Sequence, residues 1–334
     1  MNADEALDAS KNEESSSTIL FDQLNERHSN SPVEKNQYDL TEYEDDTDCI
    51  ELIHCRIDEI PDFSRFKNLM DLSLRQNLLS SINQNMAITT LTKLELYDNQ
   101  IERRLQQIEN LDALVNLTSL DLSYNRLHSI QGLSKLINLR SLYFVHNKIT
   151  AITGLDSLRS LELLELGDNR IKKIENLDNL TNLRQLYLGK NKIRCIENTE
   201  KLINLEVFSI PGNRLINLDG ISIHSDLREI YVSDQRITSL LPVKDLKNLT
   251  LIDASNNEIE KVDGVCDLPL LEDLWLNDNK IDDWNEVEKL SGIGNLRTIY
   301  LERNPIYHKD RTSYRRKIMF TLPQVTQIDA AACR

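Results

Sequence analysis

Apolar residues return along most of this chain with a period of 22 residues. In residues 139–158, Leu142 and Phe144 alternate with polar neighbours, which predicts a short strand with one buried face. After Asn147 the apolar residues follow at intervals of three, which predicts tight 3₁₀-like turns rather than a long helix. None of these pieces can bury its apolar side alone, so we expect the repeats to stack.

Each repeat has one fixed polar position, usually Asn, which we call the anchor. An Asn side chain carries a donor and an acceptor, so it can satisfy backbone groups where the chain turns away from the strand. The intervals between anchors are 22 residues, except for one of 26 and one of 25. The twelve anchors are Cys55, Asn77, Asn99, Asn125, Asn147, Asn169, Asn191, Asn213, Gln235, Asn257, Asn279 and Asn304.

This spacing resembles the leucine-rich-repeat pattern L-x-x-L-x-L-x-x-N/C-x-L. The expected fold is an α/β leucine-rich-repeat solenoid of about twelve 22-residue repeats, with a parallel sheet on its concave face. Short 3₁₀-like or helical returns should form the convex face. We assign residues 49–306 to the solenoid and residues 307–334 to a C-terminal cap. The basic run 308–317, with Tyr314, Ile318 and Met319 at helical spacing and Pro323 after them, predicts an amphipathic capping helix.

Residues two, four and six before each anchor should line the concave face, because their side chains point away from the buried leucines. The column four residues before the anchor, which we call the concave row, holds five carboxylates and five aromatic rings in twelve places. Small residues such as Gly167 and Gly189 flank these rings. Ordered exposed rings are typical of protein interfaces, although Tyr and Trp also favour strands for packing reasons. The row reads Glu51, Ser73, Glu95, Asp121, Tyr143, Glu165, Tyr187, Ser209, Tyr231, Asp253, Trp275 and Tyr300.

Charge separates an N-terminal tail from the repeats. Residues 1–48 contain 14 acidic and 3 basic residues, which leaves a net charge of −4 for the rest of a chain whose total is −15. With few aliphatic residues, this tail is predicted to be disordered. The three concave columns hold nine acids against two bases, Arg75 and Lys93, so we expect a basic protein partner. Such a face would repel nucleic acid.

Other chemistry has little support in the sequence. The five cysteines lack metal-ligand spacing, and no HExxH, GxSxG or phosphate-binding glycine loop occurs. We therefore expect no enzyme activity, no catalytic residue, no metal and no cofactor. With no 18-residue apolar run and no signal-like N-terminus, we expect a protein that is neither secreted nor membrane-bound.

The repeats together with the ending "YLERNPIY…YRRKIMFTLPQVTQID" closely resemble the leucine-rich-repeat regulatory subunit of type-1 serine/threonine protein phosphatase. The resemblance covers about residues 49–334. It implies a non-catalytic subunit that binds the phosphatase catalytic subunit and controls its assembly, targeting or activity. A further phosphatase inhibitor subunit is a second implied partner, and a role in chromosome segregation in the nucleus and cytoplasm is also implied.

The resemblance also implies which residues bind the phosphatase. Family positions with Phe are Tyr143 and Tyr187 here, and one with Glu is Asp273, so ring and charge are kept. An insertion in "IERRLQQIENLDAL" puts the local curvature and the use of Glu95 in doubt. The implied binding residues are Asp121, Tyr143, Glu165, Tyr187, Asp253, Asp273, Trp275 and Tyr300.

One alternative stays open, and two others lack the features they require. The repeat length is shared with spliceosomal and tubulin-folding proteins, so a scaffold that clamps another protein, such as a spliceosomal RNA-binding protein, is the closest alternative. An extracellular receptor would need a signal peptide and cysteine-paired caps. An enzyme would need a convergent polar pocket, and the sequence shows neither feature.

Overall fold

The computed structural model describes residues 35–102 and 110–333 of the 334-residue chain. The chain divides into two units, Met1–Lys35 and Asn36–Arg334. The second unit contains every element described below. Most of the predicted acidic tail, residues 1–34, lies outside the described residues.

Each repeat contributes one three-residue strand whose middle residue is buried and whose outer two residues face the concave side. This is the pattern expected when alternate side chains point to opposite faces of a sheet. The strands are β1 Cys49–Glu51, β2 Asp71–Ser73, β3 Lys93–Glu95, β4 Ser119–Asp121, β5 Ser141–Tyr143, β6 Leu163–Glu165, β7 Gln185–Tyr187, β8 Val207–Ser209, β9 Glu229–Tyr231, β10 Leu251–Asp253, β11 Asp273–Trp275 and β12 Thr298–Tyr300, followed by β13 Gln327–Ile328 and β14 Ala331–Ala332 in the cap.

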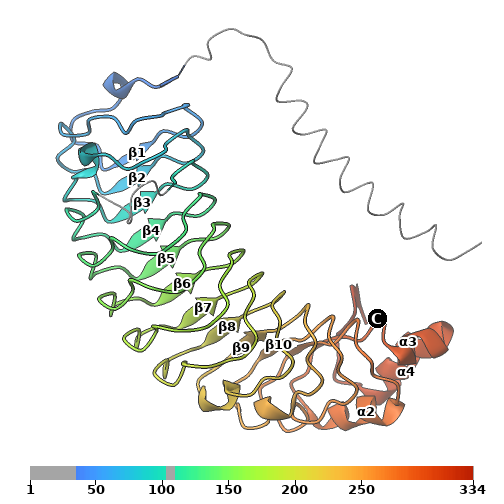
Figure 1. Ribbon diagram of the computed structural model, residues 1–334. Coiled ribbons are helices and arrows are strands. Elements are labelled where there is room, and N and C mark those ends of the chain that lie inside the picture. The colour runs from blue at the N-terminus through green and yellow to red at the C-terminus, as the bar shows by residue number, and fades with distance from the viewer. Residues whose placement is uncertain (1–34, 103–109, 334) are drawn as a thin grey trace, which may run out of the picture. The chain divides into compact units, whose positions relative to one another are not determined.

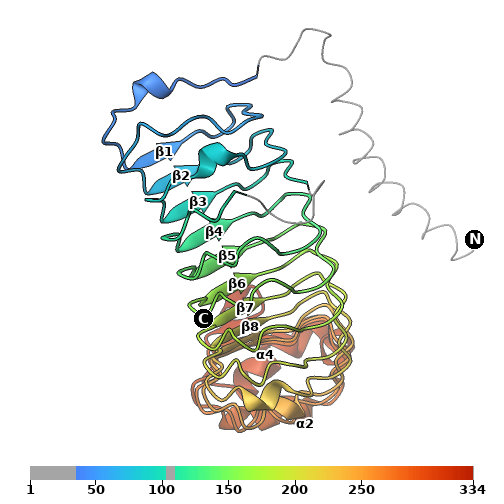
Figure 2. The same cartoon turned by 60° about the vertical axis from the view of Figure 1, so that its left-hand side comes forward.

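The sheet follows chain order, and each strand from β1 to β12 pairs with the next one in parallel. Within the unit Asn36–Arg334 the strands line the inner side of a curved coil, and the short helices lie on its outer side (Figure 1). Figure 2 shows the strands stacked one above another. The predicted solenoid is confirmed, and only β14 adds to the sheet in the antiparallel sense among the described strands.

Aliphatic side chains fill the inside of the coil. The middle strand residues Leu142, Leu164 and Leu186 have no exposed surface, and Phe144 and Phe208 are the large rings that join them there. Burial of one such side chain contributes about 1.5–3 kcal/mol, so the repeated leucines account for most of the stabilisation. The insertion that follows Asn99 leaves the pairing of β3 with β4 in register.

The anchors form a ladder of buried amides. Asn147 accepts a hydrogen bond from the backbone N–H of Leu127 at 3.0 Å and donates to the carbonyl oxygens of Leu122 and Phe144. It thereby joins its own strand end to the preceding repeat. Gln235 makes the same kind of bonds with its longer side chain. The predicted structural role of the anchor is thus visible in the hydrogen bonds.

The convex returns are turns and short helices. They include the 3₁₀ helices η2 Gln84–Met86, η3 Ile221–Ile223, η4 Leu241–Val243 and η5 Leu290–Gly292, and the α-helix α2 Trp284–Lys289. One turn requires glycine: Gly154 has φ +72°, and a Cβ there would lie 2.3 Å from the carbonyl oxygen of Ile130. Other repeats place Asn176 and Asn198 at this turn, and Asn tolerates the left-handed backbone.

The N-terminal end of the coil differs from the prediction. Residues 36–48, which the sequence places in the disordered tail, run across the first repeat and contain the 3₁₀ helix η1 Leu40–Glu42. The Tyr43 hydroxyl donates to the carbonyl oxygen of Glu51, and Arg65 donates to Asp45 and to the carbonyl oxygen of Tyr43. The side chains that pack on the core are Tyr38, Leu40 and Tyr43. These few apolar residues cover the open end of the solenoid, which charge composition alone does not reveal.

The C-terminal end is covered by two helices, α3 Pro305–Lys309 and α4 Arg311–Thr321. In α4, Tyr314 and Ile318 are buried against the last repeat, as predicted. Met319 is not part of this packed face, because it points outward with 37% of its surface exposed. The predicted single helix is interrupted at Asp310, whose side chain caps α4 by accepting from the N–H of Ser313.

Candidate protein-binding surface

The eight implied binding residues all lie on the concave side, at the first or third residue of a strand. Register pairs place Asp121, Tyr143, Glu165 and Tyr187 on four neighbouring strands, β4 to β7. The other four come from β10, β11 and β12. Strands β8 and β9 separate the two groups and contribute Ser209 and Tyr231 to the concave row.

In the first group, the carboxylates are held by the turn that follows each strand. Asp121 Oδ1 accepts the N–H of Ser123 at 2.8 Å, and Glu165 Oε1 accepts the N–H of Gly167 at 2.9 Å. Burial raises the pKa of the Asp121 carboxyl, although the Ser123 bonds act in the opposite direction. Burial likewise raises the pKa of Glu165 to about 7. Glu165 is therefore a carboxyl whose charge changes near neutral pH.

The rings in the middle of the face are fixed by polar neighbours on the same strand. The hydroxyl of Tyr187 donates to Gln185 Oε1 at 3.1 Å, and that of Tyr231 donates to Glu229 Oε2 at 2.8 Å. Burial is the main cause that raises the pKa of Tyr187. Tyr231 was not among the implied binding residues, but its place in the concave row between the two groups makes it a further candidate.

In the second group, Trp275 and Tyr300 pack edge to face with ring centroids 5.8 Å apart. The Trp275 Nε1 atom is buried, and no hydrogen-bond partner for it exists among the described residues. An unpaired buried N–H is costly, so this atom carries a free-energy penalty in the folded chain. The Tyr300 hydroxyl already accepts from Gln327 Nε2 at 3.0 Å.

Asp253 is less available than the sequence suggests. Only 9% of its surface is exposed, because its carboxylate turns back to accept hydrogen bonds from the N–H and the hydroxyl of Ser255. Asp273, on the neighbouring strand, is partly exposed. The charge that Asp253 offers to a partner is therefore screened by its own hydrogen bonds.

The two basic residues of the concave columns are already engaged. Lys93 Nζ lies 2.7 Å from Glu95 Oε1, and Arg75 lies 3.9 Å from the other oxygen of the same carboxylate. Glu95 also accepts from the hydroxyl of Ser73. Both bases thus share the single carboxylate of Glu95, and the remaining acids of the face still outnumber them. Glu95 is consequently a structural residue of this surface.

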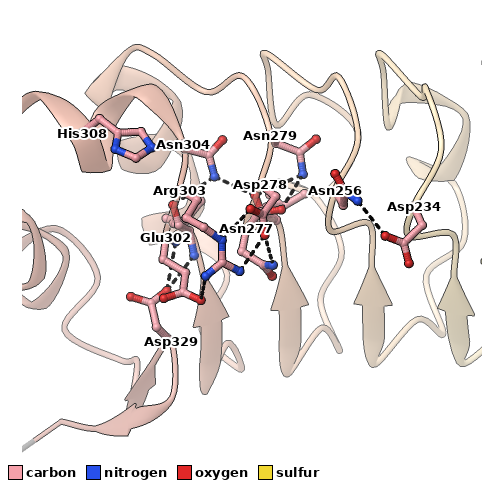
Figure 3. Close-up of polar contacts among 12 residues, drawn as sticks. Asp234, Asn256, Asn277, Asp278, Asn279, Glu302, Arg303, Asn304, His308 and Asp329 are labelled. Atoms are coloured by element: carbon pink, nitrogen blue, oxygen red, sulfur yellow. Dashed lines mark hydrogen bonds and ion pairs between the residues drawn. The ribbon is translucent and has the colours of Figure 1, made fainter. Parts of the chain in front are cut away.

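The edge beside the strand ends carries a second set of polar contacts in the C-terminal repeats (Figure 3). Arg303 donates to both carboxylate oxygens of Asp278, at 2.5 and 2.7 Å, and also to Glu302. Further along the edge, Asn256 donates to Asp234 at 2.7 Å. Such pairs join neighbouring repeats and hold the edge of the surface rigid.

Features of a small-molecule site are not seen at this surface. Among the residues that the structure describes, no group of His, Cys, Asp and Glu is placed to hold a metal ion. A groove of about 810 Å³ lies instead along the flank where the strands begin, with Thr92, Asn138 and Arg140 in its lining. Within the same described ranges, no helix is long and apolar enough to cross a membrane.

These features define a leucine-rich-repeat solenoid with an acidic and aromatic concave face. The family model for leucine-rich repeats in two copies matches residues 115–157, 159–200 and 247–289. An internalin from Listeria monocytogenes has the same fold, with a TM-score of 0.72 and 22% identity over 84% of this chain and 79% of that one.

Curated relatives are named as phosphatase subunits. The chain is 48% identical over 91 residues to protein phosphatase 1 regulatory subunit SDS22 homolog of Caenorhabditis elegans, which is 27% of this chain and 28% of that protein. It is 41% identical over 86 residues to protein phosphatase 1 regulatory subunit SDS22 of Saccharomyces cerevisiae, a quarter of each chain. The matched segments thus span about a quarter of these relatives' length, and over that part the predicted resemblance is confirmed.

Proposed function

We propose that this chain is a non-catalytic regulatory subunit that holds the catalytic subunit of a type-1 serine/threonine protein phosphatase on its concave face. The observation that carries the proposal is the concave row itself, in which rings and carboxylates stand on one rigid parallel sheet. The names of the matched relatives supply the identity of the partner. They favour this reading over a scaffold for an RNA-binding protein.

The geometry supports a folded partner rather than a small ligand. From β4 to β12 the face spans eight strand spacings, about 40 Å, which suits an interface of the standard size of roughly 1,600 Å². The partner should present basic side chains opposite Asp121, Glu165 and Asp273, and apolar surface opposite the rings of Trp275 and Tyr300. The eight implied residues remain candidates for these contacts, with Asp253 as the weakest.

Purified chain mixed with purified phosphatase catalytic subunit tests the proposal directly. A 1:1 complex in size-exclusion chromatography is the expected result, and separate elution at concentrations of about 10 μM would contradict it. A further inhibitor subunit as partner, and a role in chromosome segregation in the nucleus and cytoplasm, are extended from the sequence resemblance. Imaging of a fluorescent fusion through the cell cycle tests the location.

A further inference from the structure

The residue directly before each anchor forms a continuous edge of the concave face, which we call the rim. Its backbone is left-handed throughout the described repeats, and this conformation is unfavourable for residues with a bulky side chain. Five repeats place Asp or Asn at the rim and one places Gly, residues that tolerate it. These are Asp98, Asp168, Gly212, Asp234, Asn256 and Asp278.

The other six repeats depart from this preference, with His54, Gln76, Tyr124, His146, Lys190 and Arg303 at the rim. Two of these, Tyr124 and His146, are rings on neighbouring repeats. Tyr124 has φ +53° and His146 has φ +52°. Their rings stack with centroids 4.8 Å apart and an interplanar angle of 20°. The ring of Tyr97 continues the stack, with its centroid 4.8 Å from that of Tyr124. We call Tyr97, Tyr124 and His146 the ring stack.

Charged groups close both ends of the ring stack. At one end, the guanidinium of Arg75 lies 4.8 Å from the centroid of the Tyr97 ring. At the other end, His146 Nδ1 lies 2.5 Å from Asp168 Oδ2. The Arg75 contact shows that a guanidinium fits against these rings, while its own charge is balanced by Glu95. The ring stack comes from three successive repeats, and with Arg75 and Asp168 at its ends the row of contacts spans five.

The ring stack is open to solvent and adjoins the candidate surface. Tyr124 has 41% of its surface exposed, and the side chain of His146 is 58% exposed. Tyr124 follows Asp121 by three residues, on the turn that leaves β4. Carboxylates of Asp98 and Asp168 lie on the same rim to either side. An accessible aromatic ridge beside excess acid favours a cationic side chain.

We propose that the ring stack is the end of the partner-binding surface and receives an arginine or lysine side chain of the basic partner. The stem of that side chain packs on Tyr124 and His146, and its charge meets Asp121 or Asp168. This inference rests on the proposed function. It adds contacts at Tyr124 and His146, which lie outside the three concave columns and which neither the sequence pattern nor the matched relatives' names assign, beside Tyr97 in the column two residues before the anchor.

A purely structural role explains the ring stack less well. In the C-terminal repeats the rim is held by polar pairs such as Asp278 with Arg303, which join neighbouring repeats through hydrogen bonds without stacked rings (Figure 3). The ring stack instead keeps aromatic surface exposed, with 41% of Tyr124 open to solvent. That exposed surface is what a partner would cover.

Replacement by Asn separates the two roles, because Asn suits the left-handed backbone but offers no ring. We expect Tyr124→Asn and His146→Asn to weaken binding of the purified phosphatase catalytic subunit by about tenfold each in surface-plasmon kinetics. Their melting temperatures should stay at or above that of the wild type. Asn256→Ala, at the same rim position far from the stack, should leave affinity unchanged.

The results of these experiments distinguish a failure of this inference from a failure of the proposed function. Unchanged affinity in both Asn variants, together with weaker binding by Trp275→Ala, would overturn this inference alone. Loss of folding in Tyr124→Asn would show that the stack serves the solenoid and would also overturn it. If the wild-type chain does not bind the catalytic subunit, the proposed function and this inference both fail.

Discussion

Glu165 and Gly167 are matched to one another on the concave face. The backbone N–H of Gly167 donates to Glu165 Oε1 at 2.9 Å, and a Cβ at position 167 would lie 2.7 Å from that oxygen. The absence of a side chain at Gly167 therefore lets the carboxylate fold down beside its own strand. There it is partly buried, and this burial raises its pKa to about 7.

Gly167→Ala tests this relationship. The added methyl group should push the Glu165 carboxylate outward, break its bond with the N–H, and return its pKa toward the value of about 4.3 for an exposed Glu. Carbon-13 NMR of the labelled carboxyl, followed through a pH titration, measures the change. Gly189→Ala, one repeat later, is the control, because its methyl group would meet Pro211 rather than the carboxylate. A pKa still near 7 in Gly167→Ala would contradict the account.

Glu165 should also make stability depend on pH in a defined sense. Its pKa is raised in the folded chain, so folding favours the neutral carboxyl. This contribution is present below about pH 4.3 and is lost as the pH rises through 7. Relative to Glu165→Gln, the wild type should lose about 2–3 kcal/mol of unfolding free energy between pH 4.5 and 8. Urea titrations of both proteins at these two pH values provide the measurement, and a constant difference would contradict the prediction.

Asn169 tests the anchor ladder. Its side chain accepts from the N–H of Ile149 and donates to the carbonyl oxygens of Phe144 and Leu166, all of them buried. Asn169→Ala leaves these groups unpaired and should lower the unfolding free energy by about 3 kcal/mol or more. Asn182→Ala is the control, since its exposed side chain makes one bond, to the carbonyl oxygen of Arg159. Urea titrations measure the unfolding free energy of both variants. An equal decrease in the two would contradict a special stabilising role of the anchor.

Arg65 tests the N-terminal cover. It links residues 36–48 to the first repeat through Asp45 and the carbonyl oxygen of Tyr43. We expect Arg65→Ala to cost about 1–3 kcal/mol and to raise amide hydrogen exchange in β1. Lys67→Ala, two residues away and exposed, should have little effect. Exchange in β1 that matches the wild type would mean that this segment does not stabilise the end of the coil.

The sequence predicts the repeats well because period and burial coincide. Each strand from β1 to β12 lies where an alternating apolar pair precedes an anchor, so counting back from the anchor predicts that Tyr187 and Trp275 face the concave side. The orientation of an individual side chain cannot be predicted from the repeat pattern. Asp253 turns back on Ser255, and Met319 points outward, because local hydrogen bonds and the break at Asp310 decide their orientation.

Two features missed by the pattern share a physical reason. Tyr38 and Tyr43 cover the first repeat from a segment with no period, and Tyr124 belongs to the rim, which lies outside the three columns. The period of the apolar residues predicts only the side chains at positions that recur in every repeat. Side chains at the ends of the solenoid or at the rim do not follow the repeat pattern. Their packing roles can be identified only from the residues that they contact in the structure.

The affinity of Trp275→Ala for the purified phosphatase catalytic subunit tests the central claim most directly. Trp275 lies in the concave row and packs on Tyr300 as part of an aromatic pair, so its truncation should cost the complex about 2 kcal/mol or more, roughly thirtyfold in Kd. Ile216→Ala is the control, because Ile216 is 63% exposed and lies outside the concave columns. Surface-plasmon kinetics should show the loss in Trp275→Ala alone, with unchanged melting temperatures. Wild-type affinity in a folded Trp275→Ala protein would contradict binding through the concave face.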